Sequence, residues 1–202
     1  MEKTKAIRQL KELRKKSNNM RLAAEKWNSS WKTLFAIILS ARTRDETTIS
    51  VANKLFRKYS TLGKLENARL NDIEKTIMPV NFYKNKSKNI SSCSRTLIRE
   101  YGGKVPRDFE ELIKLSGVGR KTANVFLSEY GEKAIGVDTH VFYISRKLGW
   151  SRGKTPEKVE EDLKKLFPKN YWVKINPFLV RFGKTYKSRK RKDELLLRLK
   201  KL

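Results

Sequence analysis

One stretch of the chain, between Arg107 and Phe142, combines residue types that suit the binding of phosphate groups. Its central turn and the start of the next segment consist of Gly117, Val118, Gly119, Arg120, Lys121 and Thr122. Two glycines around one apolar residue let the backbone turn tightly and approach a ligand closely. A helix that begins directly after them would direct its N–H groups and the positive end of its dipole at the turn, which suits a phosphate. The segment therefore predicts a clasp for a nucleic-acid backbone that does not read base sequence.

The residues around this turn predict the two helices that would position it. Asp108 is suited to cap a helix over Phe109–Lys114, and a second helix is expected from Lys121 to about Tyr130. A Gly-x-Gly pattern alone is weak evidence for a phosphate-binding turn, because glycines are also common at the C-terminal ends of helices. A helix, the turn, an Arg-Lys pair and a second helix in one unit, at 109–130, form a much more specific signal.

The rest of the chain has apolar residues at helical spacing almost everywhere, for example Ile49, Ala52, Leu55 and Phe56. The period-two alternation that predicts strands is hard to find. Glycines and prolines divide the pattern into about ten segments of ordinary helix length. The sequence therefore predicts an all-α fold of short helices joined by short loops.

The last segment, 184–202, is strongly basic and then amphipathic, with KSRKRK followed by ELLLRLKKL. It is expected to be either a solvated, partly helical end or an arm that contacts DNA. If it makes no contact with DNA, its leucines would argue for a packing role.

The charge of the chain indicates a polyanion as its partner. Among 202 residues, 48 Lys and Arg oppose 21 Asp and Glu, so the formal net charge is +27. Each phosphate that Lys or Arg neutralises releases a condensed counterion, and this favours nucleic acid over a membrane surface or a ribosome as the partner.

The counts of cysteine and histidine exclude several kinds of site. With Cys93 and His140 as the only such residues, the chain cannot form an internal disulfide, a cysteine-ligated zinc or iron–sulfur site, or a centre with several histidines. No apolar run approaches the roughly 20 residues that cross a bilayer, and the N-terminal segment has no apolar signal-peptide core. We therefore expect a soluble intracellular protein, in the cytoplasm or nucleoid, without a cofactor.

Several motifs extend beyond the phosphate clasp: LSGVGRKTANVFL (Leu115–Leu127) followed by VDTH (Val137–His140), LSARTRD (Leu39–Asp45) and FYKNKSKNI (Phe82–Ile90). Over roughly residues 30–185 the chain resembles the endonuclease III family of helix–hairpin–helix DNA glycosylases. The resemblance implies two all-α lobes with double-stranded DNA, carrying a damaged base or an abasic site, across the cleft between them. The central lobe would span 24–136, and 1–23 with 137–202 would form the other, in a monomer.

The chain departs from the family pattern at three places. Ser116 stands where members usually have proline, and Tyr143 stands where they often have arginine. After Phe182, members carry four cysteines that hold an iron–sulfur cluster, whereas 185–190 contains no cysteine. We therefore expect no cluster, with helical packing and the basic tail in its place.

By this resemblance Lys121 and Asp138 are the catalytic residues. A neutral lysine amine can attack C1′ of the sugar, displace the base and form a Schiff base that permits strand cleavage. Without the resemblance, Lys121 would be read as a phosphate contact. Asp138 would stabilise the sugar cation and assist proton transfer. An aspartate at this position is also what an N-cap of the following helix would require, and the capping and catalytic roles are compatible.

The resemblance also assigns residues to DNA. Arg42 and Phe82 occupy the positions of intercalating side chains that fill the stack when a base is flipped, although Phe82 could equally belong to the core. His140 would orient a phosphate or the backbone at the turn in which it lies, or be an ordinary histidine whose hydrogen bonds are satisfied within the protein. The hairpin carbonyls that could hold a monovalent cation are those of Ile113, Leu115 and Val118.

Three functions are compatible with these residues. The first is a bifunctional glycosylase and AP lyase that removes oxidised pyrimidines from duplex DNA. The second is a monofunctional mismatch or alkylated-base glycosylase, and the third is a non-catalytic DNA-binding protein. Lys121 together with Asp138 favours the first, because monofunctional relatives lack the lysine.

Overall fold

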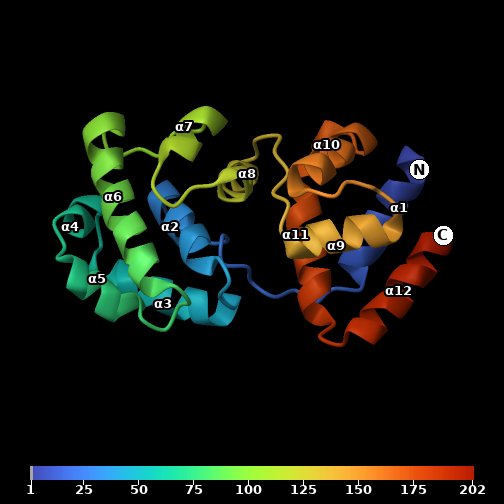
Figure 1. The fold of residues 1–202 in the computed structure, drawn as a ribbon, viewed down its shortest axis with the longest axis horizontal. Helices are drawn as coiled ribbons and strands as arrows, with labels where there is room; N and C mark the ends of the chain where they lie inside the picture. The colour runs from blue at the N-terminus through green and yellow to red at the C-terminus, as the bar shows by residue number, and fades with distance from the viewer. Residues whose placement is uncertain (1) are drawn as a thin grey trace. The chain divides into compact units, whose positions relative to one another are not determined.

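The computed structural model describes residues 2–202, and in this range the chain forms twelve α-helices, one short 3₁₀ helix and no strand (Figure 1). The all-α prediction is confirmed. The described helices include none that is long and apolar enough to span a membrane.

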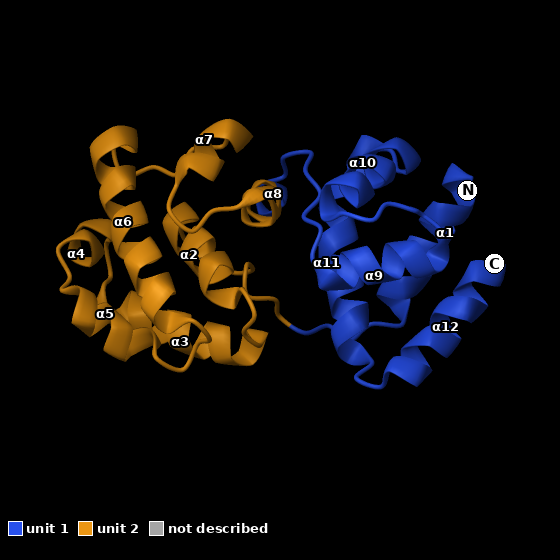
Figure 2. Ribbon diagram, viewed as in Figure 1, with its two compact units in different colours: residues 1–20, 128–202 blue, residues 21–127 orange. Residues whose placement is uncertain are grey.

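The described residues form two compact units (Figure 2). Arg21–Leu127 forms the first, here called the middle unit, and the part of the chain up to Met20 forms the second, the terminal unit, together with Ser128–Leu202. The expected lobe ended at 136, whereas the chain leaves the middle unit after Leu127. The difference arises because Ile135 is fully buried in the core of the terminal unit.

The middle unit is built around α2 (Ser30–Ser40), which is buried along almost its whole length, from Trp31 to Leu39. A helix that is apolar on nearly all sides is stable only when other helices enclose it. α3 (Asp45–Lys58) and α6 (Tyr83–Tyr101) pack on α2, while α4 (Leu62–Glu66) and α5 (Leu70–Ile77) pack on α6. The long helix α6 therefore joins α4 and α5 to α2.

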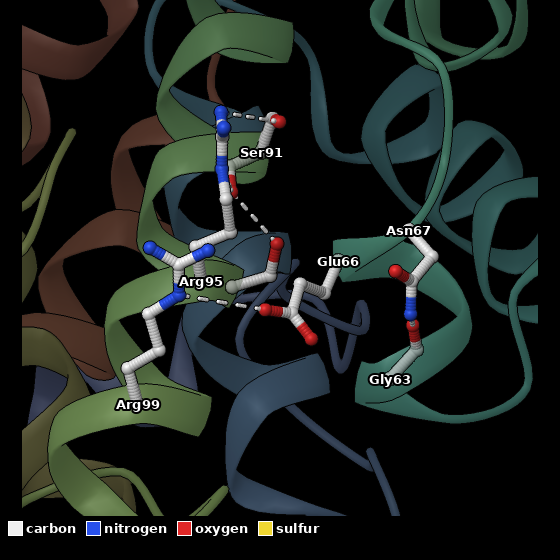
Figure 3. A network of polar contacts seen from close by, with 7 residues as sticks. Gly63, Glu66, Asn67, Ser91, Arg95 and Arg99 are labelled. Atoms are coloured by element: carbon white, nitrogen blue, oxygen red, sulfur yellow. Dashed lines mark hydrogen bonds and ion pairs between the residues drawn. The ribbon is translucent and has the colours of Figure 1, made fainter.

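One ion pair joins α4 and α6, and further hydrogen bonds lie within each of them (Figure 3). Arg99 Nε lies 3.9 Å from Glu66 Oε1, and Arg95 Nη2 donates to Ser91 Oγ over 3.1 Å. Within α4 and its C-cap, Asn67 Nδ2 donates to the Gly63 carbonyl over 2.9 Å. Because the Arg99 side chain is largely exposed, its ion pair contributes at most about 1 kcal/mol. Apolar burial in these helices therefore dominates.

The terminal unit joins the two ends of the chain. α1 (Lys3–Lys15) and α9 (Thr139–Leu148) pack on α11 (Trp172–Thr185), α12 (Arg189–Lys201) packs on α9 and α1, and α10 (Pro156–Leu166) packs on α9. The 3₁₀ helix Lys169–Tyr171 precedes α11.

The fully buried side chain of Gln9 links three parts of this unit. Its Nε2 donates to the Leu199 carbonyl over 2.9 Å, and its Oε1 accepts from Trp150 Nε1 over 2.7 Å. This satisfied pair of hydrogen bonds fixes α12 against α1, since an unpaired buried amide would be costly.

The tail forms a packed helix. Leu195, Leu196 and Leu199 of α12 lie in the core of the terminal unit, whereas Leu197 is exposed. The apolar face of the tail thus has a packing role. DNA contact by its basic residues stays a prediction.

Candidate functional site

The phosphate clasp is a helical hairpin made by α7 (Phe109–Lys114) and α8 (Arg120–Glu129). Asp108 caps α7 as predicted, with its Oδ1 accepting from the Glu111 N–H over 3.0 Å. The turn closes through the Val118 N–H, which donates to the Leu115 carbonyl over 3.0 Å. The apolar side chain between the two glycines, that of Val118, is buried beneath this turn.

Gly117 is required at this turn for two reasons. Its φ of +83° lies in the left-handed region, which side-chain-bearing residues rarely adopt. A Cβ at Gly117 would also lie 2.9 Å from Asn89 Cβ. Asn89 Oδ1 in turn accepts from Ser116 Oγ over 3.1 Å. Asn89, on α6, therefore supports the hairpin, and Ser116 contributes a hydrogen bond at the position where proline was expected.

At position 119, by contrast, nothing within the described chain requires a glycine. A Cβ built on Gly119 would meet nothing within 4 Å, and its φ lies outside the left-handed region. Its surface next to the start of α8 is open, which is the condition for a close approach by a ligand.

The residues that follow begin α8. Arg120 is exposed, with its guanidinium 5.2 Å from the centroid of the Phe109 ring, while Lys121 and Thr122 are half-buried. The Ala123 N–H donates to the Gly119 carbonyl over 3.0 Å, so regular helix starts at the turn. Lys121 thus lies in the first turn of α8, at the positive end of the helix dipole.

Asp138 belongs to the terminal unit, whereas Lys121 belongs to the middle unit. Asp138 is the N-cap of α9, and its Oδ1 accepts from the Val141 N–H over 2.8 Å. The turn before it is held by Asn176, whose Nδ2 donates to the Gly136 carbonyl over 2.7 Å. The capping role of Asp138 is therefore present, and the bond fixes the place of its carboxylate.

His140 lies in the first turn of α9, directly against the backbone of α11. A Cβ at Gly183 would overlap the imidazole ring, at Nδ1, Cγ and Cε1. Gly183 was not predicted, because the side chain that requires a glycine there, His140, is 43 residues away in the chain.

The two expected intercalating residues lie together in the middle unit. The Arg42 guanidinium is 5.2 Å from the centroid of the Phe82 ring, and the Phe82 side chain is 56% exposed. The alternative that Phe82 belongs to the core is therefore wrong. Insertion of either side chain into DNA stays a prediction.

The remaining expectations concern bound groups. The Leu115 carbonyl, one of three expected to hold a monovalent cation, already accepts the Val118 N–H; a carbonyl has a second lone pair, so the site stays a prediction. Burial raises the pKa of the Cys93 thiol to about 12. Within residues 2–202, no three Cys, His, Asp or Glu side chains are grouped so that they could hold a metal ion.

Comparison with known proteins identifies the family. Residues 35–169 match the HhH-GPD superfamily of base excision DNA repair proteins. Endonuclease III of Thermotoga maritima is 45% identical over 155 residues, which cover 76% of this chain and 73% of that protein.

Two solved structures match the fold. One, described as a trapped endonuclease III–DNA covalent intermediate, has a TM-score of 0.85 and 35% identity, over 94% of this chain and 90% of that chain. A non-covalent endonuclease III–DNA complex has a TM-score of 0.86 and 32% identity, over 98% of this chain and 99% of that chain. The chain therefore belongs to the endonuclease III family within the HhH-GPD superfamily of base excision DNA repair proteins.

Proposed function

We propose that the protein, acting as a monomer, excises damaged pyrimidines, oxidised ones in particular, from double-stranded DNA and then cleaves the strand at the abasic site through Lys121. The observation that carries this proposal is the position of Lys121 in the first turn of α8, next to the Gly117–Gly119 turn. The turn would bind a backbone phosphate and thereby bring the sugar of the flipped nucleotide to the amine. The relative whose structure is described as a covalent DNA intermediate supports a covalent route.

The chemistry needs a neutral amine at Lys121. Its nitrogen bonds to C1′ as the bond from C1′ to the base breaks, and the base leaves with a proton. Opening of the sugar ring places a proton on O4′ and leaves an imine between Nζ and C1′. Loss of a proton from C2′ then expels the 3′ phosphate, which cleaves the strand, and water hydrolyses the imine to regenerate the amine.

Asp138 would supply the anion for this reaction. Positive charge develops on the sugar as the base leaves, and a fixed carboxylate stabilises it better than water, which must reorient. The hydrogen bond from the Val141 N–H to Oδ1 holds that carboxylate in place. The same position of the carboxylate would therefore serve both the cap and the reaction.

Arg42 and Phe82 would fill the space that the flipped base leaves. A half-exposed aromatic ring with a guanidinium over its face offers a flat surface that can stack on bases and donors that can reach the unpaired partner. His140 would contact a phosphate from the start of α9.

Borohydride trapping on a duplex that contains an abasic site tests the proposal. Wild-type protein should give a covalent adduct, and Lys121→Gln should give none while it keeps its affinity for DNA, because an amide cannot form the imine. Lys104→Gln, which removes the same charge from an exposed position outside the site, should trap like wild type. Undiminished trapping by Lys121→Gln would assign the nucleophile elsewhere. Base excision without trapping by wild type would favour a monofunctional glycosylase, and neither activity would favour a DNA-binding protein.

A further inference from the structure

Two residues of the middle unit adopt an unfavourable backbone conformation at the same place. Arg42 has a φ of +54° and Phe82 has a φ of +58°, in the left-handed region that residues with a Cβ rarely occupy. Within the described chain only Lys26 also does so among non-glycine residues. Strain of this kind persists only where surrounding structure imposes it, and it clusters at functional sites.

The side chain of Lys86, which projects from α6, holds the turn that carries Arg42. This side chain is 5% exposed although it carries an amine. Its Nζ donates to the Leu39 carbonyl over 2.7 Å, to the Ala41 carbonyl over 2.7 Å and to Thr43 Oγ1 over 3.2 Å. These acceptors surround Arg42 in the turn between α2 and α3, and their number equals that of the donors on a lysine ammonium.

The second strained residue, Phe82, is the N-cap of α6, the helix that carries Lys86. The Lys86 N–H donates to the Phe82 carbonyl over 3.0 Å, so Phe82 precedes the first turn of α6 at a defined place. Asn81 adds a second link, because its Nδ2 donates to the Arg42 carbonyl and its N–H donates to Thr43 Oγ1 over 3.2 Å. The loops that carry Arg42 and Phe82 are thus tied into one body before any ligand arrives.

We propose that Lys86 is a positioning residue for DNA insertion: it keeps Arg42 and Phe82 preassembled in their left-handed conformations, and it touches neither base nor phosphate itself. This inference rests on the proposed function, in which the pair enters the base stack. Preassembly matters because a side chain ordered in advance loses less freedom on binding. A displacement of the order of 1 Å in a positioned group can lower a rate about 100-fold.

The test uses Lys86→Met, which keeps the length and volume of the side chain but removes its donors. Excision of a damaged base from duplex DNA should fall about 10- to 100-fold in kcat/KM, while affinity for undamaged duplex is unchanged. Lys88→Met, which removes the same charge from an exposed position on α6, should behave like wild type. Lys86→Arg, which keeps a charged donor, should recover part of the loss.

A double-variant cycle separates positioning from general damage to the fold. Once Phe82→Ala and Arg42→Ala have removed the inserted side chains, addition of Lys86→Met should lower kcat/KM less than 2-fold further, because nothing is left to position. Borohydride trapping on a single-stranded abasic oligonucleotide, which needs no insertion into a stack, should proceed at the wild-type rate. A full further loss in the triple variant, or slow trapping on the single strand, would overturn the proposal.

The outcomes distinguish this proposal from the proposed function. If Phe82→Ala and Arg42→Ala leave excision unchanged, the insertion role itself fails. If they lower excision but Lys86→Met does not, only the positioning role fails. If circular dichroism shows that Lys86→Met does not fold, Thr43→Val takes its place, because it removes the hydroxyl that accepts from both Lys86 and Asn81. This variant should lower excision from duplex DNA while trapping on the single-stranded abasic oligonucleotide proceeds at the wild-type rate. Unchanged excision by folded Thr43→Val would overturn the proposal.

Discussion

Left-handed backbone occurs at several places in the middle unit, and the hairpin and the Arg42–Phe82 pair use opposite kinds of residue for it. The hairpin uses Gly117, for which the conformation costs little. The turn at Arg42 and the start of α6 at Phe82 use residues with long side chains, for which it is unfavourable. A turn that binds phosphate with its backbone needs no side chain, whereas a pair that fills a DNA stack does. Where a side chain must be presented, buried hydrogen bonds such as those of Lys86 have to maintain the geometry.

The largest effect should come from a side chain placed in the hairpin turn. Gly117→Ala is expected to lower the free energy of unfolding by about 2–4 kcal/mol, because it adds both left-handed strain and a clash with Asn89. Urea unfolding measures this loss.

Gly119→Ala is the matched control in the same turn. Its added Cβ meets nothing, so stability should change by less than about 1 kcal/mol, while affinity for duplex DNA falls because the methyl group occupies the open surface. Equal loss of stability in both variants would show that the two glycines do not differ in role.

The second effect concerns the pKa of Lys86, which burial lowers to about 8 from an ordinary value of 10.5. Between these pH values the unfolded chain binds a proton at Lys86 that the folded chain does not, so this residue makes stability rise with pH. Relative to Lys86→Met, wild type should therefore gain on the order of 2 kcal/mol between pH 7.5 and 10. Urea unfolding of both proteins across this range measures the gain, and a difference that stays constant would contradict the lowered pKa.

A smaller effect separates the strain at Phe82 from its function. Phe82→Gly should be about 1 kcal/mol more stable than Phe82→Ala, because glycine accepts the left-handed conformation. Both variants should discriminate equally poorly between damaged and undamaged duplex. Thermal unfolding with paired binding assays checks this, and a glycine variant that is less stable than the alanine variant would argue against strain at Phe82.

The smallest effect contrasts charge with insertion. Arg120→Gln should make the slope of log affinity against log salt shallower by about 0.9, as expected for one lost phosphate contact. Phe82→Ala should leave this slope unchanged and lower the preference for damaged duplex. Binding titrations at several salt concentrations measure both quantities, and a changed slope for Phe82→Ala would assign it a phosphate contact.

The sequence predicted the parts of the site that depend on near neighbours. The hairpin and the caps at Asp108 and Asp138 follow from residue types within a few positions of each other, and the structure has them. The start of α8 differs by one residue from the prediction. Local chemistry thus accounts for the elements that present Lys121 and Asp138.

Supports that act across the chain were not predicted. Lys86 and Asn89 belong to the Phe82–Ile90 motif of the family resemblance, but their supporting roles were not predicted, because their partners are backbone carbonyls and a glycine far away in the sequence. Gly183 carried no signal, since its requirement comes from the His140 ring. Ile135 shifted the unit boundary for a similar reason, because hydrophobicity does not tell which core a residue joins.

The hydrogen bond between Gln9 and the Leu199 carbonyl joins segments far apart in the chain, and this affects when α1 can pack during synthesis. Helix α1 leaves the ribosome before the middle unit, whereas its partners α11 and α12 follow that unit in the chain. The middle unit can complete its packing as soon as Leu127 has emerged, whereas the first helix of the terminal unit stays unpacked until α11 and α12 have followed. The nascent chain therefore carries a folded middle unit together with an exposed amphipathic α1, and a nascent chain that stalls before α11 has emerged would leave α1 open to chaperones and proteases.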